Sequence, residues 1–521
     1  MSQGMGEARE ALRQHFGYSD FRPGQGEVIL AALSGRDSLA VMPTGTGKSI
    51  CYQIPAALLP GLVLVVSPLI SLMGDQVRSL REAGIRGSYL NSSLNARQQE
   101  IVMRRALDGW YDIMCVAPER LRDQRFRDFA AAASVPLLAV DEAHCVSQWG
   151  QDFRPAYREV ASFVGALPHR PPVMALTATA TERVRRDVVG LLGLRSPYQQ
   201  LSSLDRPNLR FFSFELTPKR RRQWIVSYVR AHAGQSGIVY ASTRKQVDEL
   251  AEALRAAGVR AAAYHAGYDN ASRLRAQEDF ARDEVQVMVA TNAFGMGIDK
   301  SDVRFVINVG LPLSLEEYYQ EAGRAGRDGE PAECYLLWSK GDIRTCHFLL
   351  EHSDLPEGIS NAQAEHLMAQ RERLLSSMIG YAMSDSCLRG RILSYFGQGL
   401  GEAGGERGCG ACSVCLGEGP ERYLRAERAR TTFGRGLRER ELPSEYEVGD
   451  EDEALFQRLR ALRKRLADEA SVPPYVVFSD ATLRAMVRRH PQSLDELHEV
   501  SGVGEVKLRR YGEAFLGEIL A

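Results

Sequence analysis

What the sequence lacks excludes several kinds of protein. Its longest apolar runs, such as LLPGLVLVV, fall far short of the roughly 20 residues that a membrane-spanning helix needs. The N-terminal segment MSQGMGEAREALRQHF is polar and lacks the apolar core of a signal peptide. The 65 lysines and arginines are balanced by 66 acidic residues, so binding to a polyanion would depend on local patches. We therefore expect a cytoplasmic protein with no membrane partner.

Cysteine is also scarce, with nine residues in a chain of 521, which is too few for a disulfide scaffold. Four of them form two overlapping CxxC spacings with a further thiol upstream, a pattern that suits a closed tetrahedral structural Zn²⁺ site. An iron–sulfur cluster is the alternative, and disulfides are disfavoured in a cytoplasmic chain. The predicted ligands are Cys387, Cys409, Cys412 and Cys415. We interpret the others as buried or incidental: Cys51, Cys115, Cys145, Cys334 and Cys346.

The chain is too long for one core, and its length predicts roughly three or four domains. Short apolar runs alternate with helical patterns from about residue 25 to residue 200, and a second such series follows. This alternation predicts two α/β units in tandem, each a parallel sheet with helices on both faces. The runs are SLAVM, LVLVVS, IMCVAP, LLAVDE and VMALTAT, then SGIVYAS, AAAYHAG, VQVMVATNAFG, VRFVINV and ECYLLW. Residues 341–396 are predicted to be mostly helical.

The segment MPTGTGKS (42–49) has the context of a phosphate-binding loop, because it follows the strand-like SLAV and precedes a helical pattern. Gly45 and Gly47 allow backbone N–H groups to surround an anion, Lys48 can reach the terminal phosphates, and Ser49 can bind Mg²⁺. The strict pattern has glycine at Met42, so the match is partial. An ordinary glycine turn is the alternative, and the GKS sequence in this context disfavours it.

A second segment, LLAVDEAH, ends a predicted buried strand with Asp141 and Glu142. One carboxylate can hold Mg²⁺ through water, while its neighbour orients or deprotonates an attacking water. A solvated strand end is the alternative. The phosphate loop upstream favours nucleotide hydrolysis.

Taken together, the motifs resemble those of a known family. PTGTGKS, DEAH, ALTATA, ATNAFGMGID and QEAGRAGRDG follow one another as in superfamily 2 helicases, and FGYSDFRPGQ and AHCVSQWGQDFRPAY narrow the resemblance to RecQ DNA helicases. The likeness covers about residues 10–415, and the segment from Leu455 onward resembles the HRDC domain. It implies an α/β fold with two tandem RecA-like parallel-sheet domains, a helical zinc-binding domain and a small all-α C-terminal HRDC bundle. The expected limits are 1–205, 206–340, 341–418, a linker over 419–450 and 451–521.

This resemblance also assigns roles within the nucleotide site. Tyr18, Arg22 and Gln25 are expected at the adenine, with the glutamine amide on the base edge. Arg324 and Arg327 lie three residues apart, so on a helix they would share a face and point at the γ-phosphate. A charged surface turn is the alternative for GRAGRDG. The ATP- and Mg²⁺-binding set is completed by Thr44, Gly45, Thr46, Gly47, Lys48, Ser49 and Asp141, and the catalytic set is Lys48, Asp141, Glu142, His144, Gln320, Arg324 and Arg327.

Three aromatic residues, Trp149, Phe153 and Tyr157, follow DEAH directly. The corresponding loop of RecQ-like proteins contacts single-stranded DNA, which implies DNA binding by Trp149, Phe153 and Arg154. Stacking is worth roughly 1–3 kcal/mol per base, enough to couple strand binding to the hydrolytic residues. Core packing is the alternative for the aromatics. Gln151 departs from the histidine usual in the family.

The C-terminal segment offers candidate DNA contacts. A basic helix face is predicted from Arg460, Arg463, Lys464 and Arg465. Gly502 and Gly504 could meet a phosphate beside Lys507, or simply close a helix–turn–helix connection. About 35 residues separate Cys415 from Glu451, too few for the winged helix that RecQ proteins usually carry there.

The resemblance implies an ATP-dependent 3′–5′ DNA helicase in repair and recombination, which uses ATP, Mg²⁺ and structural Zn²⁺. We expect it to act on single-stranded DNA and on tailed or branched duplexes, with single-strand-binding and recombination proteins as partners, at the nucleoid of a bacterium. A translocase or an RNA helicase without independent unwinding ability is one alternative. A non-enzymatic DNA-binding or annealing protein is another, and the intact set of Lys48, Asp141, Glu142, Arg324 and Arg327 speaks against it.

Overall fold

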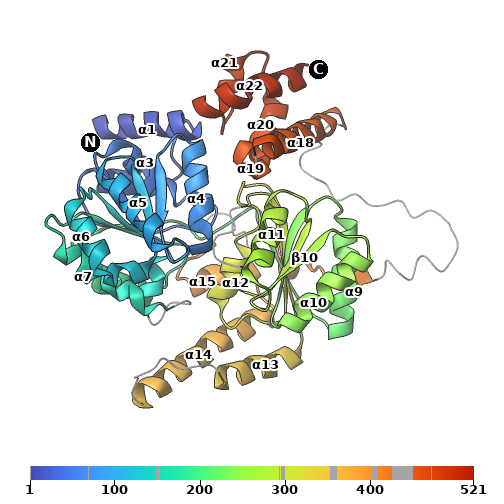
Figure 1. Cartoon of the computed structure of the whole chain (residues 1–521). Helices are drawn as coiled ribbons and strands as arrows, with labels where there is room; N and C mark the ends of the chain where they lie inside the picture. The colour runs from blue at the N-terminus through green and yellow to red at the C-terminus, as the bar shows by residue number, and fades with distance from the viewer. Residues whose placement is uncertain are drawn as a thin grey trace.

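The computed structural model describes the chain apart from residues 1, 69, 148–152, 293, 295–299, 353–360, 401–407, 425–449 and 471. Trp149, Gln151 and most of the predicted linker 419–450 therefore lie outside the described residues. Within the described part, two parallel sheets, a group of helices and a C-terminal helical bundle follow one another along the chain (Figure 1).

The first sheet has the order β3-β4-β2-β5-β6-β1-β7. Its central strands are apolar and fully buried, because helices cover both faces of a parallel sheet. The strands are β1 (Ser38–Val41), β2 (Val63–Val66), β3 (Gly87–Leu90), β4 (Ile113–Val116), β5 (Leu138–Val140), β6 (Val173–Thr177) and β7 (Tyr198–Leu201). The helices are α1 (Ser2–Phe16), α2 (Gln25–Leu33), α3 (Ile50–Leu58), α4 (Ile70–Glu82), α5 (Ala96–Leu107), α6 (Gln124–Ala132), α7 (Glu159–Ala166) and α8 (Glu182–Leu191). We call residues 2–201 the first α/β unit.

The second sheet has the order β10-β11-β9-β12-β13-β8 and forms the second α/β unit, residues 209–338. Its pairings are all parallel among the described strands. The strands are β8 (Leu209–Glu215), β9 (Ser236–Ala241), β10 (Ala261–Tyr264), β11 (Val287–Ala290), β12 (Val303–Val309) and β13 (Ala332–Trp338). The helices are α9 (Pro218–Ala231), α10 (Arg244–Ala256), α11 (Asn270–Ala281) and α12 (Leu315–Ala322).

Each of the ten predicted apolar runs contains a strand, and the prediction of two tandem parallel-sheet units is confirmed. The predicted helical stretch after Trp338 is also present, as α13 (Lys340–Glu351), α14 (Asn361–Ala382) and α15 (Leu388–Tyr395). These helices share one apolar core with the second sheet, where Met378, Leu388 and Ile392 are buried. Two short helices follow, α16 (Ser413–Leu416) and α17 (Glu421–Leu424).

The C-terminal bundle has an apolar core of its own. Its helices are α18 (Asp450–Ala470), α19 (Pro474–Val477), α20 (Asp480–Arg489), α21 (Leu494–His498) and α22 (Glu505–Leu520). The bundle lies across both α/β units, with α22 beside α1 and α19 facing α11 (Figure 1). None of the helices in the described residues is both long enough and apolar enough to cross a membrane.

Ion pairs and backbone contacts hold the bundle in place. Arg510 pairs with Glu82 in the first unit, and Lys464 lies 2.8 Å from Glu284 in the second. The Gly502 N–H donates to the carbonyl of Gly17 at 3.2 Å. The predicted glycine hairpin therefore packs against the end of α1 in this structure.

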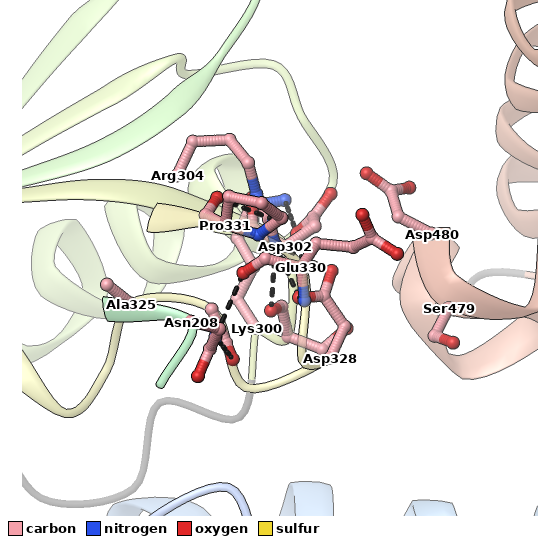
Figure 2. A network of polar contacts seen from close by, with 12 residues as sticks. Asn208, Lys300, Asp302, Arg304, Ala325, Asp328, Glu330, Pro331, Ser479 and Asp480 are labelled. Atoms are coloured by element: carbon pink, nitrogen blue, oxygen red, sulfur yellow. Dashed lines mark hydrogen bonds and ion pairs between the residues drawn. The ribbon is translucent and has the colours of Figure 1, made fainter. Parts of the chain in front are cut away.

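A buried charge cluster joins α18 and α20 to the second unit. Figure 2 shows the part of it around Lys300 and Asp302, with Asp480 of the bundle beside them. Lys300 lies between Asp283 at 2.5 Å and Asp302 at 3.0 Å. Arg463, only 1% exposed, pairs with Asp480 at 2.7 Å and lies 3.9 Å from Asp302. The predicted basic helix face is therefore wrong for Arg463, because its guanidinium is enclosed by these carboxylates.

Candidate nucleotide site between the two α/β units

The phosphate loop connects β1 to α3 in the predicted way. Gly45 and Gly47 have φ values of 82° and 78°, the left-handed region that glycine adopts without steric cost. Lys48 Nζ donates to the carbonyl of Met42 at 3.3 Å. Burial of its ammonium lowers the pKa of Lys48, although the charges of Glu142 and Asp141 oppose this shift. An anionic ligand here would therefore relieve a buried positive charge.

The residues predicted at the adenine lie at the rim of this loop. Gln25 is buried, and its Nε2 donates to the carbonyls of Thr46 at 2.8 Å and Gly47 at 3.0 Å. Its Oε1 accepts from the Arg22 N–H at 2.9 Å, while the Arg22 guanidinium donates to the carbonyl of Gly45. Tyr18 is 37% exposed. Gln25 and Arg22 thus brace the phosphate loop, and their contact with a base stays a prediction.

Asp141 and Glu142 follow β5 directly, and both are shielded from solvent. Burial and the neighbouring Glu142 charge raise the pKa of Asp141. Burial also opposes ionisation of Glu142, but its contact with His144 and the charge of Lys48 outweigh burial and lower the pKa of Glu142. Glu142 has a φ of 46°, an uncommon conformation for a residue other than glycine. Such strain is frequent where a side chain must be aimed at a ligand.

A chain of polar contacts leads from Glu142 to the second unit. His144 Nδ1 lies 3.3 Å from Glu142 Oε2 and 2.8 Å from the Thr177 hydroxyl. That hydroxyl donates to the carbonyl of Thr179 at 3.0 Å, so it accepts from the His144 Nδ1–H. The Thr179 hydroxyl in turn accepts from Gln320 Nε2 at 3.5 Å. The ALTATA segment, which the sequence marks only through its resemblance, therefore connects the predicted catalytic residues of the two units.

The two arginines do not lie on the helix that their spacing predicts. α12 ends at Ala322, so Gln320 is helical while Arg324 and Arg327 lie in the turns that follow. The expectation of a shared helix face is wrong, because Gly323 ends the helix before either arginine. The turn nevertheless lies against the phosphate loop: the Thr44 hydroxyl donates to the carbonyl of Gly323 at 3.0 Å. Arg327 faces the cavity, and Arg324 is buried close enough for its charge to lower the pKa of Glu142.

A cavity of about 760 Å³ lies between the phosphate loop and Arg327. The first unit contributes the phosphate loop and the Asp141–Glu142 pair, and the second unit contributes Arg327. The C-terminal bundle supplies a third wall through Tyr475, Ser479 and Arg488, which the sequence analysis missed. No motif marks these three residues, because their place at the cavity depends on how a separate bundle docks.

In the loop after DEAH, residues 148–152 lie outside the described part of the chain. Phe153 is partly exposed under the Arg158 guanidinium, 5.0 Å from the ring centroid. The Arg154 N–H donates to the carbonyl of Cys145 at 2.8 Å, which ties the loop to the segment carrying His144. Tyr157 is fully buried, and its hydroxyl donates to the carbonyl of Asp141 at 2.8 Å. Core packing is therefore the correct alternative for Tyr157, whereas Trp149 lies outside the described residues.

The four predicted zinc ligands come together beside β8. Their Sγ atoms all lie within 4.8 Å of one another, which fits ligands on one tetrahedral ion, where Zn–S bonds of about 2.3 Å place the sulfurs roughly 3.8 Å apart. Backbone N–H groups of Gly390 and Cys409 point at the sulfur of Cys387, each at 3.4 Å. Gly408 has a φ of 95°, and a Cβ there would lie 2.8 Å from the sulfur of Cys415. The other five cysteines are buried, as predicted.

Comparison with protein families agrees with this architecture. Residues 22–188 match the DEAD/DEAH box helicase family and residues 220–329 the helicase conserved C-terminal domain. Residues 340–416 match the RecQ zinc-binding family and residues 452–519 the HRDC domain. The Cys₄ cluster thus lies in a zinc-binding domain. The fold and the four matches define a two-domain helicase motor with zinc-binding and HRDC modules.

Two bacterial relatives match almost the whole chain. The ATP-dependent DNA helicase RecQ of Haemophilus influenzae is 37% identical over 609 positions, covering 98% of this chain and 95% of the relative. The enzyme of the same name from Bacillus subtilis is 38% identical over 596 positions, covering 99% and 98%. The solved structure of the Mycobacterium smegmatis helicase Lhr is similar in fold, with a TM-score of 0.54 at 19% identity over 94% of this chain and 74% of that one. The chain belongs to the RecQ family of ATP-dependent DNA helicases.

Proposed function

We propose that this helicase moves 3′ to 5′ along single-stranded DNA and couples each closure of its cleft to hydrolysis of one Mg²⁺-bound ATP. The observation that carries this proposal is the contact between the Arg324–Arg327 turn and the phosphate loop, through Thr44 and Gly323. Nucleotide phosphates bound at that contact would be held from both units at once. Binding then favours closure, and hydrolysis favours opening.

Within the site, each residue has a proposed role. Lys48 and the N–H groups of the loop hold the phosphates, and Ser49 and Asp141 hold Mg²⁺. A bound divalent cation would favour ionised Asp141, which burial otherwise disfavours. Glu142, oriented by its contact with His144, positions the attacking water. Arg324 and Arg327 neutralise charge that develops on the γ-phosphate.

We infer that Phe153, Arg154 and Trp149 sense the single strand and act on the hydrolytic residues. Two bonds support this coupling in the described part of the loop: Arg154 N–H to the Cys145 carbonyl, and the Tyr157 hydroxyl to the Asp141 carbonyl. Because the loop and the carboxylates share one backbone segment, a base stacked on the loop shifts the position of Asp141 and Glu142. The family points to a role in DNA repair and recombination, at the nucleoid.

The region in which RecQ proteins usually carry a winged helix is short in this chain, so strand separation in this proposal does not depend on that domain. The RecQ zinc-binding match ends at residue 416 and the HRDC match begins at residue 452. Both alignments to the bacterial relatives are longer than this chain of 521 residues, so each relative carries residues without a counterpart here. We propose that simple tailed duplexes are opened by translocation alone.

The test is ATP-dependent unwinding of one duplex carrying either a 3′ or a 5′ single-stranded tail. We expect unwinding with the 3′ tail alone, and none with Lys48→Ala, which should retain DNA binding while losing hydrolysis. Unwinding from the 5′ tail would refute the polarity. Strand-stimulated hydrolysis without unwinding from either tail would instead identify a translocase that lacks a wedge. Full ATPase activity of Lys48→Ala would refute the phosphate-loop assignment.

A further inference from the structure

Arg206 lies in the segment that links β7 of the first unit to β8 of the second, and its side chain bonds to both units. Nη1 donates to the carbonyl of Thr44 in the phosphate loop at 2.9 Å and to that of Gly323 at 3.2 Å. Nη2 donates to the carbonyls of Ala325 at 2.9 Å and Gly326 at 2.6 Å. One guanidinium therefore binds four carbonyl oxygens, three of them in the turn that carries Arg324 and Arg327.

Burying a guanidinium costs free energy of folding unless each of its nitrogens has a hydrogen-bond acceptor. Arg206 is 9% exposed, and burial of a guanidinium disfavours its charge and lowers the pKa of Arg206. Its Nε donates to Asn208 Oδ1 at 3.3 Å, so each of its three nitrogens has an acceptor. Asn208 itself donates to the carbonyls of Gly326 and Glu330, each at 2.9 Å. Only a planar, forked donor of this length matches so many carbonyls at once.

The backbone around Arg206 is itself fixed by the zinc-binding module. Arg389, at the start of α15 and two residues after Cys387, donates to the carbonyls of Leu209 at 2.5 Å, Pro207 at 3.2 Å and Arg206 at 3.4 Å. Gln398, just beyond α15, accepts from the Leu204 N–H at 2.8 Å. Residues 202–208 are thereby held against the zinc-binding module, so the Arg206 guanidinium reaches the first unit from a fixed base.

We propose that Arg206 is a positioning residue for ATP hydrolysis, which sets the Arg324–Arg327 turn and fastens it to the phosphate loop in the closed cleft. The three bonds to Gly323, Ala325 and Gly326 join the linking segment to the second unit and persist when the cleft opens. The bond to Thr44 crosses between the units and exists only when the cleft is closed. This inference rests on the proposed roles of Arg324 and Arg327.

The test compares Arg206→Gln and Arg206→Lys with Arg210→Gln. Arg210 lies on β8, is 33% exposed and pairs with Glu333 and Glu418, away from both loops. We expect strand-stimulated kcat to fall about tenfold or more in both Arg206 variants, as for loss of hydrogen bonds from a charged group. KM for ATP and the Kd of a fluorescent ADP should change less than about threefold, because the phosphate loop and the adenine residues stay in place. Arg210→Gln should match the parent in kcat.

The lysine variant separates charge from geometry. Arg206→Lys would keep the parent kcat if a positive charge near the cleft were sufficient, and that result would overturn the proposal. A lowered melting temperature with unchanged kcat per folded molecule would equally overturn it, since Arg206 would then be merely structural. A raised KM for ATP with unchanged kcat would also overturn the proposal.

A double variant keeps this inference distinct from the proposed function. Arg327→Ala should lower kcat by itself, and adding Arg206→Gln should cost much less than in the parent chain, because both changes disable one turn. Full additivity would overturn the proposal while leaving the role of Arg327 intact. If Arg327→Ala and Arg324→Ala both retained the parent kcat, the proposed function would fail, whatever Arg206 does.

Discussion

At the scale of single residues, the Thr177 hydroxyl connects His144 to the Thr179 segment, which contacts Gln320 of the second unit. It accepts from His144 and donates to the Thr179 carbonyl. Thr177→Val keeps the shape of the side chain but removes the donor to the Thr179 carbonyl and leaves His144 Nδ1 with only its 3.3 Å contact to Glu142, at a cost of about 1–3 kcal/mol of stability. We expect strand-stimulated kcat to fall roughly tenfold, because His144 loses the contact that orients it towards Glu142. Steady-state kinetics at saturating ATP and DNA measure this.

A control with a similar loss of stability is available on the second unit. Thr243 caps α10 by accepting from the Gln246 N–H, so Thr243→Ala should cost about 1 kcal/mol. That variant should melt earlier than the parent and keep its kcat. Equal kcat values for the two variants, corrected for folded fraction, would contradict a role for Thr177 in the site.

The place of a residue in the site could be predicted from the sequence where neighbouring residues along the chain determine it. The phosphate loop, the DEAH carboxylates and the four cysteines are each set by a short segment, and the structure places them as expected. Tyr157 and Arg463 were misjudged because their surroundings come from distant segments: Tyr157 enters the core of the first sheet, and Arg463 meets Asp302. Arg206 gave no signal, since its four acceptors are backbone carbonyls that any sequence would supply.

At the scale of elements, a strand was predicted where its own sequence is strongly apolar and was missed where the signal is weaker. The ten predicted strands are apolar runs, and all of them except β10 lie inside a sheet, whereas the three missed strands, β3, β7 and β8, all lie at sheet edges. β7 alternates between partly buried and exposed side chains, so its sequence YQQL carries no apolar signal. The two arginines after α12 were misplaced for a related reason: Gly323 ends the helix, but glycine is also tolerated inside helices.

The glycines beside the predicted zinc ligands Cys409 and Cys412 give a prediction at this scale. Gly408→Ala should lower zinc content and melting temperature, because the added methyl group would displace the sulfur of Cys415 and alanine disfavours a φ of 95°. Gly410→Ala is the matched control: its φ is 62°, but a Cβ there meets no atom within 4 Å. It should bear only the backbone cost, about 1 kcal/mol. Metal analysis of the purified proteins and thermal melts measure both effects, and equal zinc content in the two variants would contradict the crowding argument.

At the scale of the whole molecule, the HRDC bundle closes the nucleotide cavity from outside the two motor units. Tyr475, Ser479 and Arg488 form this wall, and they are held there by contacts to both units. Exposed ion pairs of this kind contribute only about 0–1 kcal/mol each and weaken with salt. These two pairs therefore contribute little each, and the buried approach of Arg463 to Asp302 adds a contact that salt screens much less. The motor and the bundle each have a core of their own, so the bundle can separate from the motor without unfolding.

Reversing the charges of Lys464 and Arg510 should release the bundle. In Lys464→Glu/Arg510→Glu, each new carboxylate would face Glu284 or Glu82, so attraction becomes repulsion on both units. We expect a larger radius of gyration by small-angle X-ray scattering at low salt. A fluorescent ADP should also dissociate roughly tenfold faster, which corresponds to about 1.4 kcal/mol, because the cavity loses one of its walls.

Lys245→Glu/Arg509→Glu is the matched control, since these exposed residues pair within their own helices, with Glu249 and Glu505. Adding Glu82→Arg to the first double variant should partly restore binding of the bundle to the first unit, because the pair with residue 510 is then attractive again. If neither the reversal nor 1 M salt enlarges the molecule, the bundle is held by its contacts with α1 and by the buried approach of Arg463 to Asp302, and these two ion pairs are incidental.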